Sequence, residues 1–222
     1  MKYSSTRGAV SGISFKQAVM MGLAEDGGLL VPDEFPEVSN HLPDWRSLSF
    51  QQLCLEIMQL FVGQDLRREE LENLIAKSFV FFRHPLITPL KKLKHCSVLE
   101  LFHGPTFAFK DIALQFLGNL FEHFLAEDGH SLNVLGATSG DTGSAAIHGL
   151  RGKKGIRVFM LHPQGRVSPV QERQMTTVLD SNIHNLAIEG SFDDAQSIVK
   201  ALFNDPQLKR SRRLGAVNSI NW

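Results

Sequence analysis

Residues 97–143 read SVLELFHGPTFAFKDIALQFLGNLFEHFLAEDGHSLNVLGATSGDTG, and this stretch decides the fold. Two apolar runs in it, Ser97–Phe102 and Leu132–Leu135, predict buried strands. Each run leads through a loop of small residues into a helical pattern. Ligands of an open α/β sheet bind beyond the carboxyl ends of its strands. We therefore expect Lys110, at the end of the first loop, and the second loop, Gly136–Gly143, to face one crevice.

The same unit of strand, loop and helix recurs further along the chain. Strands are predicted at Ile156–Leu161 and Ile183–Ile188, each before a helix. This alternation predicts an α/β fold with an open, mostly parallel sheet and flanking helices. Residues 1–95 show helical patterns with little strand, so we expect a mainly helical N-terminal domain there and an α/β domain over 96–222. The expected helices are 15–23, 49–61, 67–80, 110–125, 142–150, 168–179 and 191–203.

Composition narrows the classes of function. The 222 residues include 23 basic and 23 acidic side chains, so neither nucleic acid nor an anionic membrane is a favoured partner. No apolar run reaches membrane-spanning length, and no spacing of histidines or cysteines is typical of a metal site. Cys54 and Cys96 form no CxxC pair, which suits a reducing compartment. With no signal-peptide pattern after Met1, we expect a cytoplasmic protein.

Lys110 is the first candidate for chemistry. A lone lysine is usually a solvated surface charge, but the apolar triplet Phe107–Phe109 precedes this one and an amphipathic helix follows it. Apolar neighbours disfavour the charged ammonium form. An amine that is neutral part of the time can form a Schiff base with an aldehyde and later move protons.

The loop Gly136–Gly143 is the second candidate. It lacks the glycine spacings of the common phosphate-binding motifs. A run of small residues at a helix N-terminus still favours an anion such as a carboxylate, with Ser139 and Thr142 as hydroxyl donors. The alternative is a plain turn in which Asp141 or Thr142 is the N-cap.

A third candidate is Arg166, which follows another predicted strand. Ser168 and Pro169 behind it predict a helix start, with Ser168 as the N-cap. Arg166 either binds a phosphate group or is an ordinary surface arginine.

Two of these segments together resemble a known family. The run His103–Asp111, HGPTFAFKD, is similar to the cofactor-lysine motif of threonine synthases, which belong to the fold-type-II group of pyridoxal-phosphate enzymes. The run Ala137–Ala146, ATSGDTGSAA, is similar to the loop of that family that holds the substrate carboxylate and faces the cofactor ring. Many relatives in the wider group have Asn in place of Asp141, and the Asp form is typical of the bacterial and fungal branch. The resemblance covers the whole chain, since further similar segments are Tyr3–Gly8, Asp26–Leu29 and Val217–Trp222.

The resemblance implies a lyase that converts O-phospho-L-homoserine and water to L-threonine and phosphate with pyridoxal 5'-phosphate. Lys110 would hold the cofactor and move protons, and Phe109 and Asp141 would lie against the cofactor. The implied substrate-binding residues are Thr138, Ser139, Gly140, Thr142 and Arg166.

The resemblance also implies that part of the enzyme lies elsewhere. Members of the branch run to roughly twice this length, and their cofactor-phosphate loop and pyridine-nitrogen partner lie beyond the segment that resembles Val217–Trp222. We therefore expect this N-terminal part alone to bind the cofactor weakly, to make no threonine and to aggregate. The alternatives are another fold-type-II lyase or dehydratase, which would release ammonia from threonine, and a non-catalytic fragment, which would stay colourless with cofactor. The sequence predicts no oligomeric state.

Overall fold

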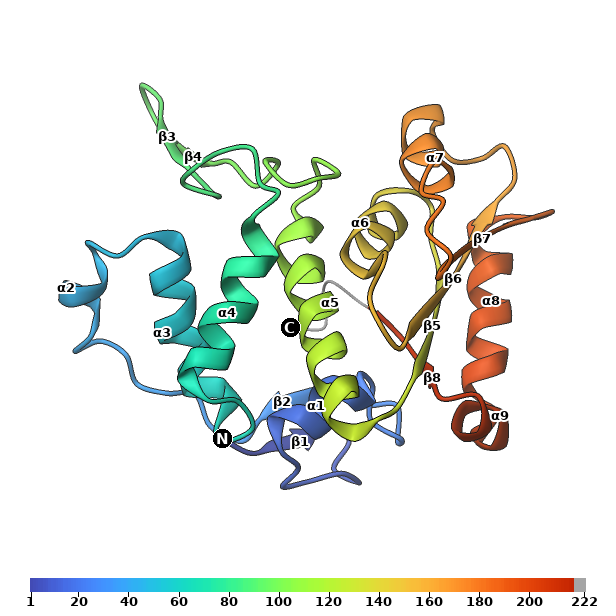
Figure 1. The fold of residues 1–222 in the computed structure, drawn as a ribbon, viewed down its shortest axis with the longest axis horizontal. Coiled ribbons are helices and arrows are strands. Elements are labelled where there is room, and N and C mark those ends of the chain that lie inside the picture. Colours follow the sequence, from blue (N-terminus) through green and yellow to red (C-terminus); the bar gives the residue numbers. More distant parts are fainter. Residues whose placement is uncertain (218–222) are drawn as a thin grey trace. The chain divides into compact units, whose positions relative to one another are not determined.

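The structure is a computed structural model that describes residues 1–217. These residues divide into two compact units, Met1–Glu100 and residues 101–217 (Figure 1). The sequence suggests that Val217 and Ile220 enter a further buried element. Ile220 lies outside the described residues, as does the rest of 218–222.

The first unit is mainly helical. Ser14 and Ser49 cap its first and third helices through capping boxes, which confirms the helix starts predicted there. The third helix packs against the fourth, and their facing side chains are buried. The helices are α1 (Phe15–Met21), α2 (Leu42–Trp45), α3 (Phe50–Val62) and α4 (Arg68–Phe79).

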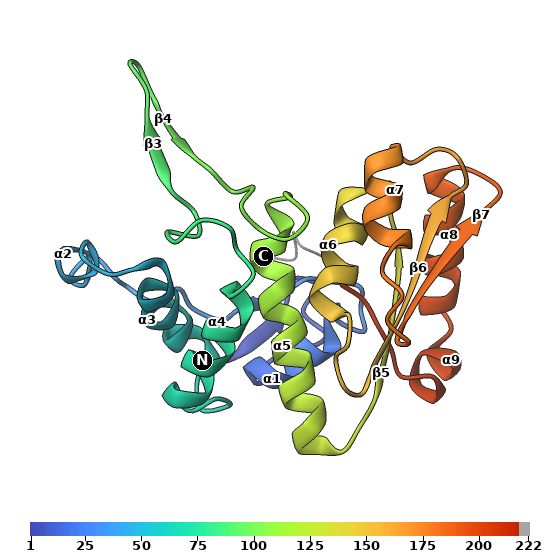
Figure 2. The same cartoon turned by 45° about the horizontal axis from the view of Figure 1, so that its top comes forward.

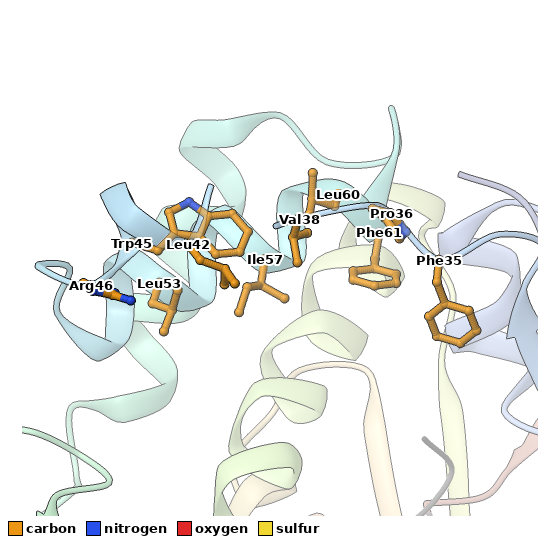
Figure 3. A pocket seen from close by; sticks show the side chains of 10 residues that line it. All are labelled: Phe35, Pro36, Val38, Leu42, Trp45, Arg46, Leu53, Ile57, Leu60 and Phe61. Carbon is orange, nitrogen blue, oxygen red and sulfur yellow. The ribbon is translucent and has the colours of Figure 1, made fainter. Parts of the chain in front are cut away.

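An apolar groove of about 470 Å³ lies on the first unit. Figure 3 shows side chains from α2, from the segment before it and from α3 around this hollow. Arg46 is the one charged residue among those that line it. The groove belongs to the packing of the segment Phe35–Arg46 onto α3.

The first unit also contains two antiparallel strand pairs. In one, β1 (Tyr3–Ser5) pairs with β2 (Leu30–Pro32); in the other, β3 (Leu90–Lys92) pairs with β4 (Ser97–Leu99). The predicted buried strand at Ser97–Phe102 is therefore wrong. Its first half is β4, an exposed strand of the hairpin that Figure 2 shows, and not a strand of the parallel sheet. Apolar character alone does not separate an exposed hairpin strand from a buried one.

The second unit is built on a parallel sheet. Its four strands lie in the order β7-β6-β5-β8, and all three pairings are parallel. This confirms the α/β class and the open parallel sheet. The first three strands were predicted, whereas the two-residue β8 was not. The strands are β5 (Leu132–Ala137), β6 (Ile156–Pro163), β7 (Ile183–Ile188) and β8 (Leu214–Gly215).

Helices cover both faces of this sheet. Helices α5 and α6 lie on one face with α7 beside α6, and α8 lies on the other face (Figures 1 and 2). Leu135 and Leu161 of the sheet pack against Ala195 of α8. The helix α9 was not predicted, because its basic residues look like a solvated surface. The helices are α5 (Lys110–Asp128), α6 (Asp141–Leu150), α7 (Pro169–Thr176), α8 (Phe192–Phe203) and α9 (Pro206–Ser211).

Two glycines set the distance between α5 and α6. A Cβ atom on Gly118 would lie 2.0 Å from the carbonyl oxygen of Gly149, and one on Gly149 would lie 2.4 Å from the carbonyl oxygen of Leu114. Each glycine is the ninth residue of its helix, counted from Lys110 and from Asp141. The two helices also run in the same direction (Figures 1 and 2), so their first residues lie next to each other.

The glycine contact predicts that Gly118→Ala lowers the free energy of unfolding by about 2 kcal/mol or more, because overpacking a close helix contact forces the backbones apart. Denaturant unfolding of the purified protein measures this. Gly129→Asn is the matched control, since Gly129 ends the same helix in a left-handed conformation that Asn tolerates and has open space around it. Equal stability of Gly118→Ala and wild type would contradict the close contact.

Candidate active site

A lysine and a carboxylate meet where α5 and α6 begin. Lys110 Nζ donates to Asp141 Oδ2 at 2.6 Å. The Lys110 side chain is only 11% exposed and that of Asp141 is 45% exposed. The two loops do meet, as the sequence predicted, but for a different reason. Lys110 does not follow a strand of the sheet; the in-register packing of two helices brings it to Asp141.

The surroundings of the Lys110 amine are not those that the sequence predicted. Phe107 and Phe109 are about half exposed, at 57% and 47%. The Lys110 Nζ atom lies 4.7 Å from the centre of the Phe109 ring. The amine thus contacts an aromatic face and a carboxylate, and not the purely apolar neighbours that the sequence predicted.

The loop before α5 is tied to a buried carboxylate. Asp111 has no exposed surface, and it accepts hydrogen bonds from the backbone N–H and the hydroxyl of Thr106 at 2.8 and 2.7 Å. Burial raises the pKa of Asp111, against the opposing effect of the Thr106 hydrogen bonds. A Cβ on Gly104 would lie 2.5 Å from the Asp111 side chain, so only glycine fits there. Asp111 closes the loop that leads into Lys110, a role that sequence reasoning missed.

The second loop is held by Thr138. Its hydroxyl accepts from the N–H groups of Gly140 and Gly143 at 3.1 and 2.9 Å and donates to the carbonyl of Gly140 at 3.3 Å. One donor and two acceptor sites are all that a hydroxyl has. Thr138 is 2% exposed. The Thr138 side chain therefore shapes the loop from within.

Gly140 needs to be glycine on two grounds. Its φ of 154° and ψ of −96° are sterically barred to other residues, and a Cβ there would lie 2.2 Å from Gln171 Oε1. Gly140 is also the N-cap of α6, so the alternative with Asp141 or Thr142 as the cap is wrong. Asp141 Oδ1 instead accepts from the N–H of Thr142 at 2.9 Å. Ser139 is exposed at the tip of this loop.

Arg166 lies on the exposed loop between β6 and α7. Hydrogen bonds from Ser191, with a smaller contribution from the charge of Arg166, lower the pKa of Asp194. The structure thus brings Arg166 near Asp194 of α8, and its contact with substrate stays a prediction. Ser168 caps α7 as predicted, accepting from the N–H of Gln171.

Membrane spans and metal sites each have structural requirements of their own. Within residues 1–217, no helix is long and apolar enough to cross a membrane, and no three His, Cys, Asp or Glu side chains are grouped to hold a metal ion. Cys54 and Cys96 are free thiols, and burial raises the pKa of Cys54 to about 11.

Comparison with known proteins gives consistent matches along the chain. Residues 2–79 match the family model described as the threonine synthase N terminus. Threonine synthase from Schizosaccharomyces pombe is 53% identical over 233 residues, covering 100% of this chain and 45% of the relative. The threonine synthase of Pseudomonas aeruginosa is 47% identical, covering 100% of this chain and 48% of the relative.

Solved structures match equally well. The crystal structure of PLP-bound threonine synthase from Brucella melitensis has a TM-score of 0.93 and 44% identity, covering 100% of this chain and 48% of that one. The structure of threonine synthase from yeast has a TM-score of 0.91 and 48% identity, covering 100% and 46%.

The parallel sheet and its flanking helices give the second unit an α/β fold. Threonine synthases match this chain over its whole length, and the chain corresponds to their N-terminal part. It spans about half the length of the curated relatives it matches.

The half-buried His148 of α6 predicts a pH dependence of stability. Its Nε2 donates to the carbonyl of Gln174 at 3.3 Å, and burial, more than any other influence, lowers its pKa below the usual 6.5. A lowered pKa means that the stability from neutral His148 is present above about pH 6.5 and is lost as the pH falls through the folded-state pKa. Denaturant unfolding at pH 8 and pH 5.5 should show a larger loss in wild type than in His148→Gln, which keeps an N–H donor. Equal losses in the two proteins would contradict the buried neutral histidine.

Proposed function

We propose that this chain is the N-terminal part of a pyridoxal-phosphate-dependent threonine synthase that converts O-phospho-L-homoserine and water to L-threonine and phosphate. The observation that carries the proposal is the contact of Lys110 with Asp141 at the starts of two in-register helices. The comparisons also support the proposal, since threonine synthases match the chain over its whole length. The two free cysteines support a cytoplasmic location as part of the proposal.

The residues present fit pyridoxal phosphate. The cofactor needs a primary amine in a sheltered place, and the Lys110 side chain is 11% exposed on the first turn of a long helix. The cofactor's aromatic ring suits a site that contains the face of Phe109. Bound at Lys110, pyridoxal phosphate supplies an electron sink for the substrate carbons. A complete synthase would provide the cradle for the cofactor phosphate from the half of its length that this chain does not match.

Lys110 has two tasks in this proposal. It anchors the cofactor covalently, and once released it moves protons at the α, β and γ carbons of the substrate. Asp141 orients the amine, since its Oδ2 lies 2.6 Å from Nζ while its Oδ1 is held by the N–H of Thr142. Both oxygens of this carboxylate are therefore fixed when the amine is free.

The substrate carboxylate is assigned to the tip of the second loop. The N–H groups of Gly140 and Gly143 are already donated to Thr138. We therefore assign the carboxylate to the hydroxyls of Ser139 and Thr142 and to the positive end of α6. Thr138 and Gly140 shape this loop, and Arg166 is kept as the candidate for the substrate phosphate.

A chimera tests the function directly. Residues 1–222 replace the matching part of the S. pombe threonine synthase, which supplies the remaining length. We expect a yellow protein that releases phosphate from O-phospho-L-homoserine and forms threonine. Release of ammonia from threonine without phosphate release would favour a dehydratase. A folded chimera that stays colourless with cofactor and shows no turnover would favour a non-catalytic fragment.

We predict that Lys110→Ala in this chimera removes turnover by a factor of 1,000 or more, on the order of magnitude expected for loss of a covalent anchor and proton carrier. It should also remove the cofactor adduct that borohydride traps, as mapped by mass spectrometry. Lys94→Ala, at an exposed position, is the control and should leave both unchanged. An adduct that maps to Lys91 or Lys94 would disprove the assignment.

We predict that Ser139→Ala raises the Michaelis constant for O-phospho-L-homoserine about tenfold or more, because a hydrogen bond to a charged group contributes roughly 1.5–3 kcal/mol. The cofactor absorbance should change little, since Ser139 contacts the substrate alone. Ser131→Ala, at the exposed position just before β5, is the control. An unchanged Michaelis constant would make the loop a plain helix start.

A further inference from the structure

The helix α7 contacts both loops that form the candidate site. It has eight residues and a firm start, with Ser168 as the N-cap and Pro169 in the first turn. The Ser168 hydroxyl also donates to Gln171 Oε1 at 3.0 Å, so the side chain of Gln171 is fixed from the cap. Gln171 and Gln174 are three residues apart and thus lie on neighbouring turns of one helix face.

Gln171 faces the second loop. Its Oε1 lies 2.2 Å from the place where a Cβ of Gly140 would be, and its backbone carbonyl accepts from the Ser144 hydroxyl at 3.5 Å. Met175, which is fully buried, lies against Gly143 on the same side. The position of the Gly140 turn, and of Asp141 after it, therefore depends on α7.

Gln174 reaches the first loop. Its side-chain Nε2 donates to the backbone carbonyl of Thr106 at 3.1 Å. Its backbone carbonyl accepts from Nε2 of His148 in α6 at 3.3 Å. Thr106 is the residue whose N–H and hydroxyl bind the buried carboxylate of Asp111, next to Lys110. A chain of four residues, His148, Gln174, Thr106 and Asp111, thus links α6, α7 and the first turn of α5 through side-chain and backbone groups.

We propose that Gln174 is a positioning residue for Lys110: it holds the carbonyl of Thr106 and, through Asp111, fixes the first turn of α5 from which the amine reaches Asp141. Gln174 itself does not touch the amine or the assigned substrate site. The inference rests on the proposed function, in which the amine must reach three substrate carbons in turn. Small errors in the position of a reacting group lower turnover strongly.

Two substitutions separate positioning from general stability. Gln174→Glu keeps the size of the side chain but turns the donor into an oxygen facing the Thr106 carbonyl, and Gln174→Met removes the hydrogen bond without adding charge. In the chimera, both should lower kcat about tenfold or more and leave the Michaelis constant for O-phospho-L-homoserine within about twofold. Arg173→Gln, on the exposed face of the same helix, is the control and should change neither.

A second measurement uses covalent trapping of the cofactor in the chimera, which does not depend on turnover. The rate at which pyridoxal phosphate forms a borohydride-trapped adduct at Lys110 should fall at least severalfold in Gln174→Met, while trapping at the exposed Lys94 stays unchanged. Wild-type values of kcat and of the trapping rate in both Gln174 variants would overturn the inference. So would an equal loss in Arg173→Gln, because it would show a general effect on α7. A wild-type chimera that makes no threonine would instead refute the proposed function, and the trapping rate would still decide the role of Gln174.

Discussion

The close contact of α5 and α6 at Gly118 and Gly149 is the constraint on which the candidate site depends. Two helices with larger residues at these positions would lie further apart, and their first residues would separate with them. The sheet contributes by fixing where α6 begins, because β5 leads directly into the loop before it. The meeting of Lys110 with Asp141 is thus a result of helix packing across residues that carry no functional group.

A buried carboxyl group on the residue after Lys110 is the second requirement. A polar group without exposed surface is unfavourable unless hydrogen bonds satisfy it. Asp111 meets this condition with the N–H and the hydroxyl of Thr106, and glycine at position 104 leaves room for it. The irregular loop before α5 is ordered by this carboxylate. Asp111 has no assigned role in binding or chemistry, yet it fixes the start of α5 and with it the position of Lys110.

Local sequence signals predicted helix starts in both units and three strands of the second unit. The serines at 14, 49 and 168 begin or cap helices as their type suggests, and β5, β6 and β7 follow from short apolar runs. The error at Ser97–Phe102 arose because an apolar run does not show whether its partner strand belongs to a hairpin or to the main sheet. The alternative that made Asp141 or Thr142 the N-cap of α6 followed from the frequency of side-chain caps, whereas Gly140 takes that place. Lys110 and Asp141 were identified because they lie in recognisable sequence motifs. No sequence motif contains Gln174, because its role depends on a hydrogen bond to Thr106 that forms only in the folded chain.

The saturated hydroxyl of Thr138 has a consequence for the loop around it. A segment whose own side chain takes up two of its N–H groups and one of its carbonyls has few other conformations of similar energy. Ordering a flexible loop at the moment of binding lowers affinity, because the lost conformational entropy opposes association. This loop is already ordered before any ligand arrives. An anion that binds at its tip would therefore meet a preorganised surface, and the free energy of its contacts would go into affinity and orientation.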